Sequence, residues 1–225
     1  MRRAIVTGHS RGIGAALGQQ LARAGWEVLG ISRSTGLQID LADPAALASW
    51  LACGDLGRFL AGSTEIVLIN NAGVLGPATL AGRQQPDNIV DAVNINVLAP
   101  MLLSNAVIAE RPEGTPLRIL HVSSGAGRRP IPGWSVYCAT KAALDQHAVT
   151  IAAERLPGLR IASVAPGVVD TGMQEQIRGE SSFPGRADFV ALKLNGQLRE
   201  PDDAAARLLA CLLGADFGDE TITAI

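Results

Sequence analysis

The sequence predicts a doubly wound α/β fold, with a mostly parallel sheet covered by helices on both faces. Short runs rich in β-branched residues alternate with longer helical patterns along most of the chain. Several of the short runs, such as 4–6 and 66–69, are continuously apolar, as in strands that are buried on both faces of a parallel sheet. A glycine-rich segment directly follows the first of these runs.

The individual elements follow from this alternation. We expect strands at 3–7, 27–33, 37–40, 65–70, 117–123 and 159–164, and helices near 12–24, 43–60, 86–110, 134–156 and 202–213. Gly25 follows the first helix, Asp43-Pro44 begins the second, and Pro157-Gly158 ends the long fourth one. This order is that of a Rossmann-type fold, and without a repeat or linker we expect residues 1–225 to form one domain.

Residues 171–200 are the least patterned part of the chain. Long irregular segments in compact domains are often functional, so this segment could be a mobile lid over a site. A surface loop with one short helix is the alternative, and the sequence does not decide between them.

Composition narrows the class of protein. The chain has 225 residues, of which 48% are hydrophobic and 18% charged, with a formal net charge of -2. It lacks the basic excess that nucleic-acid or acidic-membrane binding would need. No apolar run approaches the roughly 20 residues of a membrane span.

The cysteines, the histidines and the N-terminus each support a separate expectation, on redox state, on metal binding and on location. Cys53, Cys138 and Cys211 are widely spaced and odd in number, which favours buried free thiols over disulfides or zinc ligands. The three histidines show no metal-ligand spacing, so we expect no metal. The N-terminal residues MRRAIVTG enter a strand without a signal segment. We therefore expect a cytoplasmic protein.

The segment TGHSRGIG, residues 7–14, has two interpretations. Gly8, Ser10 and Gly12 fit the G-x-S-x-G nucleophile elbow of a serine hydrolase. Gly8, Gly12 and Gly14 also fit a phosphate-binding turn that opens a helix, with Ser10 as a phosphate or cap ligand. A hydrolase elbow normally follows several strands, whereas this segment follows one, so the phosphate-binding interpretation is favoured.

A tyrosine and a lysine provide candidate proton chemistry. The sole tyrosine, Tyr137, lies four residues before Lys141, one of two lysines, so both side chains fall on one face of the expected helix. A cation about 4 Å from a phenolate contributes about 4 kcal/mol at an effective dielectric near 20. The pKa of Tyr137 could therefore fall from about 10 toward about 7, which suits a general acid.

Other segments extend this pattern. Ser124 precedes Tyr137 by 13 residues, and Asn96 precedes Ser124 by 28. Together with the glycine turn, the motif N-N-A-G at 70–73 and P-G followed by Thr171, this order resembles the short-chain dehydrogenase/reductase family. The stretch GWSVYCATKAAL is similar to that of the benzil and sepiapterin reductase-like members.

The resemblance implies a role for each matching residue. Tyr137 would be the general acid in carbonyl reduction, and Lys141 would bind the nicotinamide ribose and lower the tyrosine pKa. Ser124 would donate a hydrogen bond to the substrate oxygen. Asn96 would hold a water molecule in the proton relay. Ser123 and Asn94 are the neighbouring alternatives, which the spacing disfavours. The residues implied in cofactor binding are Gly8, Ser10, Arg11, Gly12, Ile13, Gly14, Arg33, Asp40, Asn71, Ala72, Gly73, Tyr137, Lys141, Pro166, Gly167 and Thr171.

The cofactor expected is NADP(H) rather than NAD(H). The second expected strand ends at Arg33, where an NAD-binding site has an acidic residue. Arg11 adds a second cation suited to a 2′-phosphate. Asp40 matches the acidic residue that the family places near the adenine amine.

The substrate expected is a small-molecule ketone, and the resemblance to benzil and sepiapterin reductase-like members implies a 1,2-dicarbonyl or a side-chain dione. Ile131, Trp134, Met173 and Phe183 are candidates for an apolar pocket wall, although each could instead be packing. The ending GADFGDETITAI lacks the glycine-rich final strand of many members, which leaves a homodimer plausible and a tetramer doubtful. A non-catalytic NADP-binding sensor is the alternative function, and a hydrolase using Ser10 a less favoured one.

Overall fold

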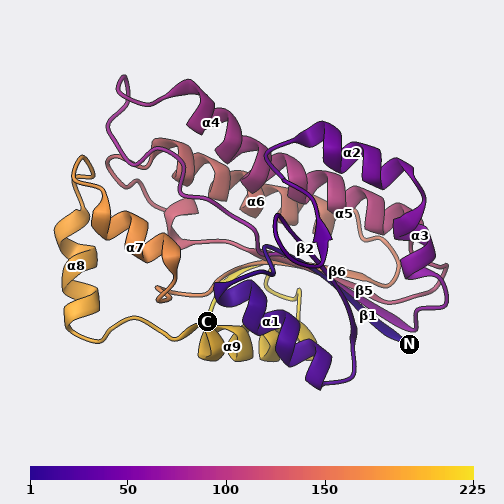
Figure 1. Cartoon of the computed structure of the whole chain (residues 1–225). Coiled ribbons are helices and arrows are strands. Elements are labelled where there is room, and N and C mark those ends of the chain that lie inside the picture. Colours follow the sequence, from indigo (N-terminus) through magenta and orange to yellow (C-terminus); the bar gives the residue numbers. More distant parts are fainter.

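A parallel sheet lies at the centre of the computed structural model, which describes all 225 residues (Figure 1). The sheet has the strand order β3-β2-β1-β4-β5-β6-β7, and every neighbouring pair is parallel. The strands are β1 (Arg2–Thr7), β2 (Glu27–Ser32), β3 (Leu37–Gln38), β4 (Glu65–Asn70), β5 (Leu117–Val122), β6 (Leu159–Ala165) and β7 (Ile222–Ala224). The predicted doubly wound α/β fold is confirmed.

Helices cover both faces of the sheet, which explains the continuously apolar strands. Ala4 and Val6 of β1 pack on the face covered by α1 (Gly12–Arg23) and α9 (Pro201–Leu213). Ile5 packs on the opposite face, which is covered by α2 (Pro44–Ala52), α3 (Asp55–Leu60), α5 (Ala99–Glu110) and α6 (Ser135–Ala153). Successive strand residues point to opposite faces, so both sets must be apolar.

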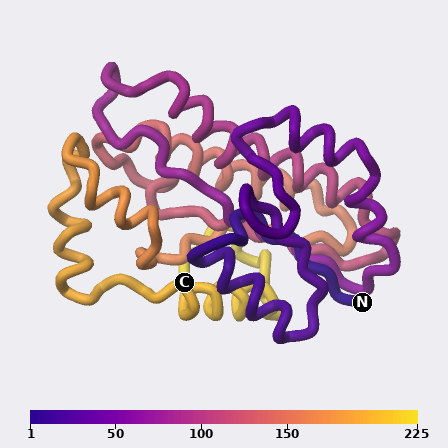
Figure 2. Tube along the Cα trace, viewed as in Figure 1, coloured from indigo at the N-terminus to yellow at the C-terminus, as the bar shows by residue number.

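The order of the strands reverses at β1, which lies between β2 and β4. Parallel strands end at one edge, so the segments after β1, β4, β5 and β6 meet outside their carboxyl ends. Figure 2 shows the chain ending at this edge, where the loop after β1 enters α1, whereas the N-terminus lies at the other end of the strands. This crevice is where a doubly wound sheet binds its ligand.

Two predicted helices are interrupted. The helix expected at 43–60 is α2 followed by α3, because Gly54 has a left-handed backbone with φ +82°. The helix expected at 86–110 is α4 (Pro86–Val93), a π-helical turn at Asn94–Leu98, and α5. Hydrophobic periodicity does not reveal a one-turn widening of this kind.

From the sequence we expect no segment apolar enough to span a membrane, and the helical segment Pro86–Glu110 is an exception. By length and composition it meets that description. Its residues Ala99, Leu103 and Val107 nevertheless pack in the core beneath the sheet, as those of a core helix do.

The C-terminal third departs from the sequence-based expectation in two places. Residues 171–200 contain two helices, α7 (Gly172–Gly179) and α8 (Arg186–Leu194), rather than one. The ending forms β7, which pairs with β6, although the sequence lacks a glycine-rich final strand. The cysteines are also less buried than expected, since Cys53 is exposed and the other two are half-buried.

Candidate active site

A cavity of about 800 Å³ opens at the carboxyl edge of the sheet, within the size range of cofactor sites. Most of the residues singled out in the sequence lie on its wall: Gly8, Ser10, Arg11, Gly12, Ile13, Arg33, Asp40, Asn71, Ala72, Gly73, Ser124, Ile131, Trp134, Tyr137, Lys141, Pro166, Gly167, Thr171 and Met173. Gly14, Asn96 and Phe183 do not line it.

The glycine turn after β1 forms one end of the cavity. Gly8 has φ +68°, and a Cβ there would lie 2.9 Å from Ala72 Cα. Gly14 is needed for packing rather than for contact with a ligand, because its Cβ would lie 2.2 Å from the Gly8 carbonyl oxygen. With the first amides of α1 facing this turn, the segment fits a phosphate-bearing cofactor.

Ser10 does not have the surroundings of a nucleophile. Its side chain is exposed on the cavity wall, and the adjacent His9 contacts Thr35 at 3.4 Å instead. A serine nucleophile needs a hydrogen-bonded base. The structure therefore favours the phosphate-binding interpretation of residues 7–14.

Thr7 ties the segment after β4 to the end of β1. Its hydroxyl accepts hydrogen bonds from the backbone amides of Asn71 and Ala72, both at 3.0 Å. The Asn71 side chain in turn donates to the Thr7 carbonyl at 2.9 Å. The sequence motif N-N-A-G therefore also braces the turn, a role that spacing alone did not indicate.

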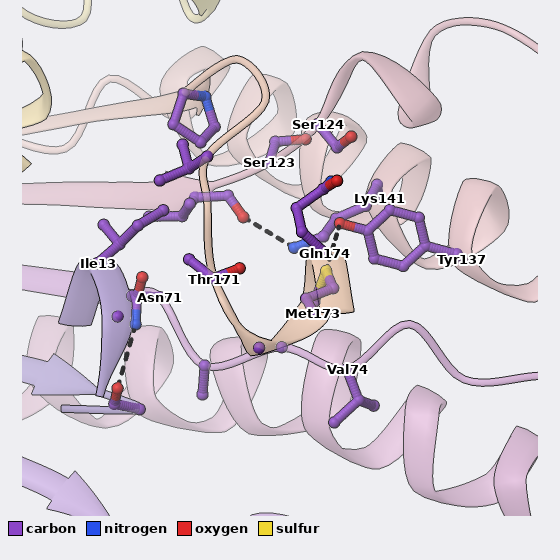
Figure 3. Close-up of a pocket in the computed structure, with 18 of the residues that line it drawn as sticks. Ile13, Asn71, Val74, Ser123, Ser124, Tyr137, Lys141, Thr171, Met173 and Gln174 are labelled. Carbon is purple, nitrogen blue, oxygen red and sulfur yellow. Dashed lines mark hydrogen bonds between the residues drawn. The ribbon is translucent and has the colours of Figure 1, made fainter. Parts of the chain in front are cut away.

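Tyr137 and Lys141 project from one face of α6 into the cavity, as the sequence predicted (Figure 3). Both are buried, with 7% and 4% of their surface exposed. Lys141 Nζ donates to the Val122 carbonyl at 2.8 Å and lies 5.7 Å from the Tyr137 ring centroid. The Tyr137 hydroxyl lies 3.9 Å from Met173 Sδ.

Ser124 is the second residue after the end of β5 and lies on the same wall. Its Oγ accepts a hydrogen bond from the Ala126 amide at 3.1 Å. Since that bond uses an acceptor lone pair, the hydroxyl proton remains free to donate into the cavity.

The pKa values of this pair differ from the sequence-based expectation. Burial raises the pKa of Tyr137 to about 12, against an opposing effect of the Ser124 hydroxyl. Burial also lowers the pKa of Lys141 to about 8, although the negative charge of Asp145 raises it. The prediction that Lys141 brings the tyrosine pKa toward 7 is therefore wrong for this arrangement, because burial dominates this pKa and the only effect that lowers it comes from Ser124.

Asn96 lies in the π-helical turn behind the cavity wall and is fully buried. Its Oδ1 accepts from the Val74 amide at 2.9 Å, and its Nδ2 donates to the Val74 carbonyl at 2.8 Å and to Thr140 Oγ1 at 3.1 Å. These bonds occupy both amide protons and one acceptor position. The side chain thus fixes the Val74 segment, and its expected role as a water ligand stays a prediction.

A buried carboxylate one turn beyond Lys141 holds the end of the sheet together. Asp145 accepts hydrogen bonds from Ser123 at 2.7 Å and Ser163 at 2.6 Å, and Arg128 Nε lies 3.1 Å from its second oxygen. Residues of β6, α6 and the segments after β5 therefore meet at one charge. Sequence reasoning missed this cluster because its partners are far apart along the chain.

Replacing Asp145 with alanine is expected to lower the free energy of unfolding by about 3 kcal/mol, because it leaves the Nε of Arg128 and two buried hydroxyls without their acceptor. Urea denaturation measures this loss. Asp55→Ala, which removes an exposed partner of Arg58, should destabilise far less. Equal losses in the two variants would contradict the assignment of a structural role to the buried charge.

The wall on the far side of Tyr137 is an aromatic cluster. Trp134 stacks on Phe183 with ring centroids 4.9 Å apart, and meets Phe189 at 5.2 Å and Tyr137 at 5.5 Å. Phe189 lines the cavity, whereas Phe183 packs behind Trp134. The prediction that Phe183 forms the wall is wrong, because Trp134 lies between it and the cavity residue Tyr137.

Arg11, Arg33 and Asp40 lie at the glycine-turn end of the cavity. All three are exposed, and neither arginine forms an ion pair within the protein. Asp40 accepts a hydrogen bond from the Ala42 amide at 3.0 Å. Both guanidinium groups are therefore available to an anionic ligand.

Comparison with known proteins agrees with this geometry. The short chain dehydrogenase family model matches residues 64–182. The benzil reductase ((S)-benzoin forming) of Bacillus cereus is 31% identical over 96% of each chain. The sepiapterin reductase of Mus musculus is 32% identical, over 92% of this chain and 90% of its own.

Solved structures show the same relationship. A short-chain dehydrogenase/reductase from Burkholderia vietnamiensis is 41% identical with a TM-score of 0.71, over 97% of this chain and 95% of its own. A short chain dehydrogenase from Burkholderia cenocepacia J2315 in complex with NADP is 28% identical with a TM-score of 0.78, over 100% of this chain and 96% of its own. This chain is an oxidoreductase of the short-chain dehydrogenase/reductase family.

Proposed function

We propose that this protein is an NADPH-dependent carbonyl reductase that converts a ketone, in particular an aryl 1,2-dicarbonyl, to an alcohol, with Tyr137 as general acid. One observation carries the proposal: the Tyr137 hydroxyl, the Ser124 hydroxyl and the Lys141 ammonium line the same cavity as the glycine turn. A site that only bound nucleotide would need no buried proton donor beside a buried cation.

Each residue has a distinct part in the reaction. The nicotinamide cofactor, when bound, supplies the hydride. Ser124 donates a hydrogen bond to the carbonyl oxygen and polarises it, as in an oxyanion hole. Tyr137 gives its proton to that oxygen. Its high pKa keeps it protonated at neutral pH, and the nearby Lys141 charge stabilises the phenolate that forms.

The apolar wall suits a bulky substrate. Ile131, Trp134, Met173 and Phe189 line the part of the cavity next to Tyr137. Flat aromatic groups pack well against such a surface. The names of the relatives, benzil reductase and sepiapterin reductase, favour substrates of this kind, so benzil is the first compound to assay.

The proposal is tested by following NADPH oxidation with benzil and with unrelated aldehydes, quinones and pterins. Turnover of benzil with formation of benzoin supports it. Tight NADPH binding without turnover on the whole panel would contradict it and favour a sensor.

The preference for NADPH over NADH is expected to depend on Arg33. Arg33→Asp should lower kcat/KM for NADPH by about 100-fold, because it removes a cation and adds a charge that repels the 2′-phosphate. The same change should raise kcat/KM for NADH, since a carboxylate can accept the ribose 2′-hydroxyl. Steady-state rates with both cofactors measure the effect.

Arg83→Asp provides a control, because Arg83 is also exposed and does not line the cavity. It should leave the cofactor ratio unchanged. An Arg33→Asp enzyme that still prefers NADPH as strongly as the wild type would overturn the cofactor assignment.

A further inference from the structure

Gln174 is a buried polar side chain that the reaction described above does not use. It lies in the first turn of α7, lines the cavity, and has only 7% of its surface exposed. Its Oε1 is fully buried without a hydrogen-bond partner, and its Nε2 donates no hydrogen bond to any protein group. A buried carbonyl oxygen without a hydrogen-bond partner is costly, so this position on the cavity wall calls for a partner outside the chain.

The position of Gln174 places that partner on the substrate. Met173, the preceding residue, has its sulfur 3.9 Å from the Tyr137 hydroxyl, where the reacting oxygen must lie. Ile177, one turn later on α7, packs into the aromatic cluster with Trp134. Figure 3 draws Gln174 among the residues that line the pocket, next to Met173 in the chain.

The rest of this wall offers the substrate little else to bind. The neighbouring cavity residues Ile131, Met173, Ile177 and Phe189 are apolar, and the charged residues Arg129 and Glu175, which also line the cavity, are exposed rather than buried in this wall. Ser124 and Tyr137 are committed to the reacting oxygen in the proposed reaction. A second polar atom on the substrate, close to the first, would therefore find its partner in the Gln174 carboxamide, which offers both a donor and an acceptor.

We propose that Gln174 is a specificity determinant that selects carbonyl compounds with a second oxygen on the carbon next to the reacting carbonyl. This inference rests on the proposed function, and the substrate feature recognised is the second oxygen. A half-turn about the Cγ–Cδ bond exchanges the oxygen and the NH₂ group of the Gln174 carboxamide. The group at the buried position can therefore donate to a second carbonyl or accept from a hydroxyl there. A compound without that oxygen leaves the buried amide group without a partner. Enzyme sites that hydrogen-bond a substrate group reject analogues lacking that group strongly.

The test compares benzil with deoxybenzoin, in which a CH₂ group replaces one carbonyl. The two compounds differ in intrinsic reactivity, so the ratio of their kcat/KM values is compared between variants rather than within one. Gln174→Met keeps a side chain of similar length without polar amide atoms. Gln174→Met should lower the benzil-to-deoxybenzoin ratio of kcat/KM about tenfold relative to the wild type. The fall should come from a lower kcat/KM for benzil, with kcat/KM for deoxybenzoin unchanged.

Gln176→Met is the matched control, because it makes the same replacement on the exposed face of α7, outside the cavity. It should leave the ratio unchanged. Gln174→Glu is a second variant of the same shape that lacks the N–H donors, and it should also lose the preference for benzil. If Gln174→Met does not fold, Gln174→Glu decides the outcome.

Binding gives a readout that is independent of turnover. In a Tyr137→Phe background with NADPH present, Gln174→Met should weaken benzil binding about tenfold and leave deoxybenzoin binding unchanged. An unchanged ratio in both assays, with normal benzil turnover by the wild type, would overturn the role of Gln174 alone. Weaker NADPH binding with an unchanged ratio would overturn it as well, by assigning the amide to the cofactor. Lack of wild-type turnover on both compounds would instead reject the proposed function, and this inference with it.

Discussion

Tyr137→Phe is expected to lower kcat for benzil reduction by about 10³-fold while the variant still binds NADPH. The hydroxyl is the only part removed, and a general acid contributes about 10²–10⁴-fold to a rate. The ring itself stays packed against Trp134, so the wall of the cavity should keep its shape. Stopped-flow or steady-state NADPH oxidation measures kcat, and fluorescence titration measures cofactor affinity.

Two results would argue against this role for Tyr137. A Tyr137→Phe enzyme with near-normal kcat would show that another group protonates the product. Loss of NADPH binding together with activity would show that the tyrosine acts through the cofactor site rather than through proton transfer.

The rate should also fall as the pH rises through about 8, because Lys141 loses its proton there. Burial lowers the pKa of Lys141 to about 8, so the ammonium is present below this pH and neutralised above it. Tyr137, with its pKa raised to about 12, stays protonated throughout this range. A falling limb near pH 8 therefore reports the loss of the charge that stabilises the tyrosinate.

Lys141→Met should remove this limb and lower kcat/KM at neutral pH by about 10²-fold or more. The profile of kcat/KM between about pH 6 and pH 10 tests both statements. Lys193→Met, which removes the only other lysine, from an exposed position on α8, should keep the limb. A limb that persists in Lys141→Met would assign it to another group.

The sequence revealed the parts of the site that depend on local spacing. Tyr137 and Lys141 face the same way because they are four residues apart on one helix, and periodicity is sufficient to predict that. The glycine turn could likewise be placed at the sheet edge, because it follows a strand and precedes a helix. The positions of Ser10, Arg11 and Arg33 on the cavity wall follow from the same argument.

Features that depend on three-dimensional packing could not be predicted. Phe183 and Phe189 are chemically alike and close in sequence, yet only Phe189 reaches the cavity. Gln174 gives no sequence signal, because only the folded structure shows that its amide oxygen is buried without a partner. The predicted fall in the pKa of Tyr137 is wrong for the same reason, since the extent of burial is a property of the folded protein.

The final strand and the π-helical turn show two further limits. The strand β7 is three residues long and has little hydrophobic pattern of its own, so it forms mainly because β6 offers an edge to pair with. The π-helical turn at Asn94–Leu98 interrupts a helix without any proline inside it. Both depend on neighbours that a single-sequence pattern does not contain.

The most direct test of carbonyl reduction is a product analysis with wild-type protein, benzil and NADPH in which both hydrogens on the reactive ring carbon are replaced by deuterium. We predict one benzoin formed for each NADPH consumed, with the deuterium on the carbinol carbon. Consumption of NADPH without labelled benzoin, or no consumption despite saturating cofactor, would contradict the account.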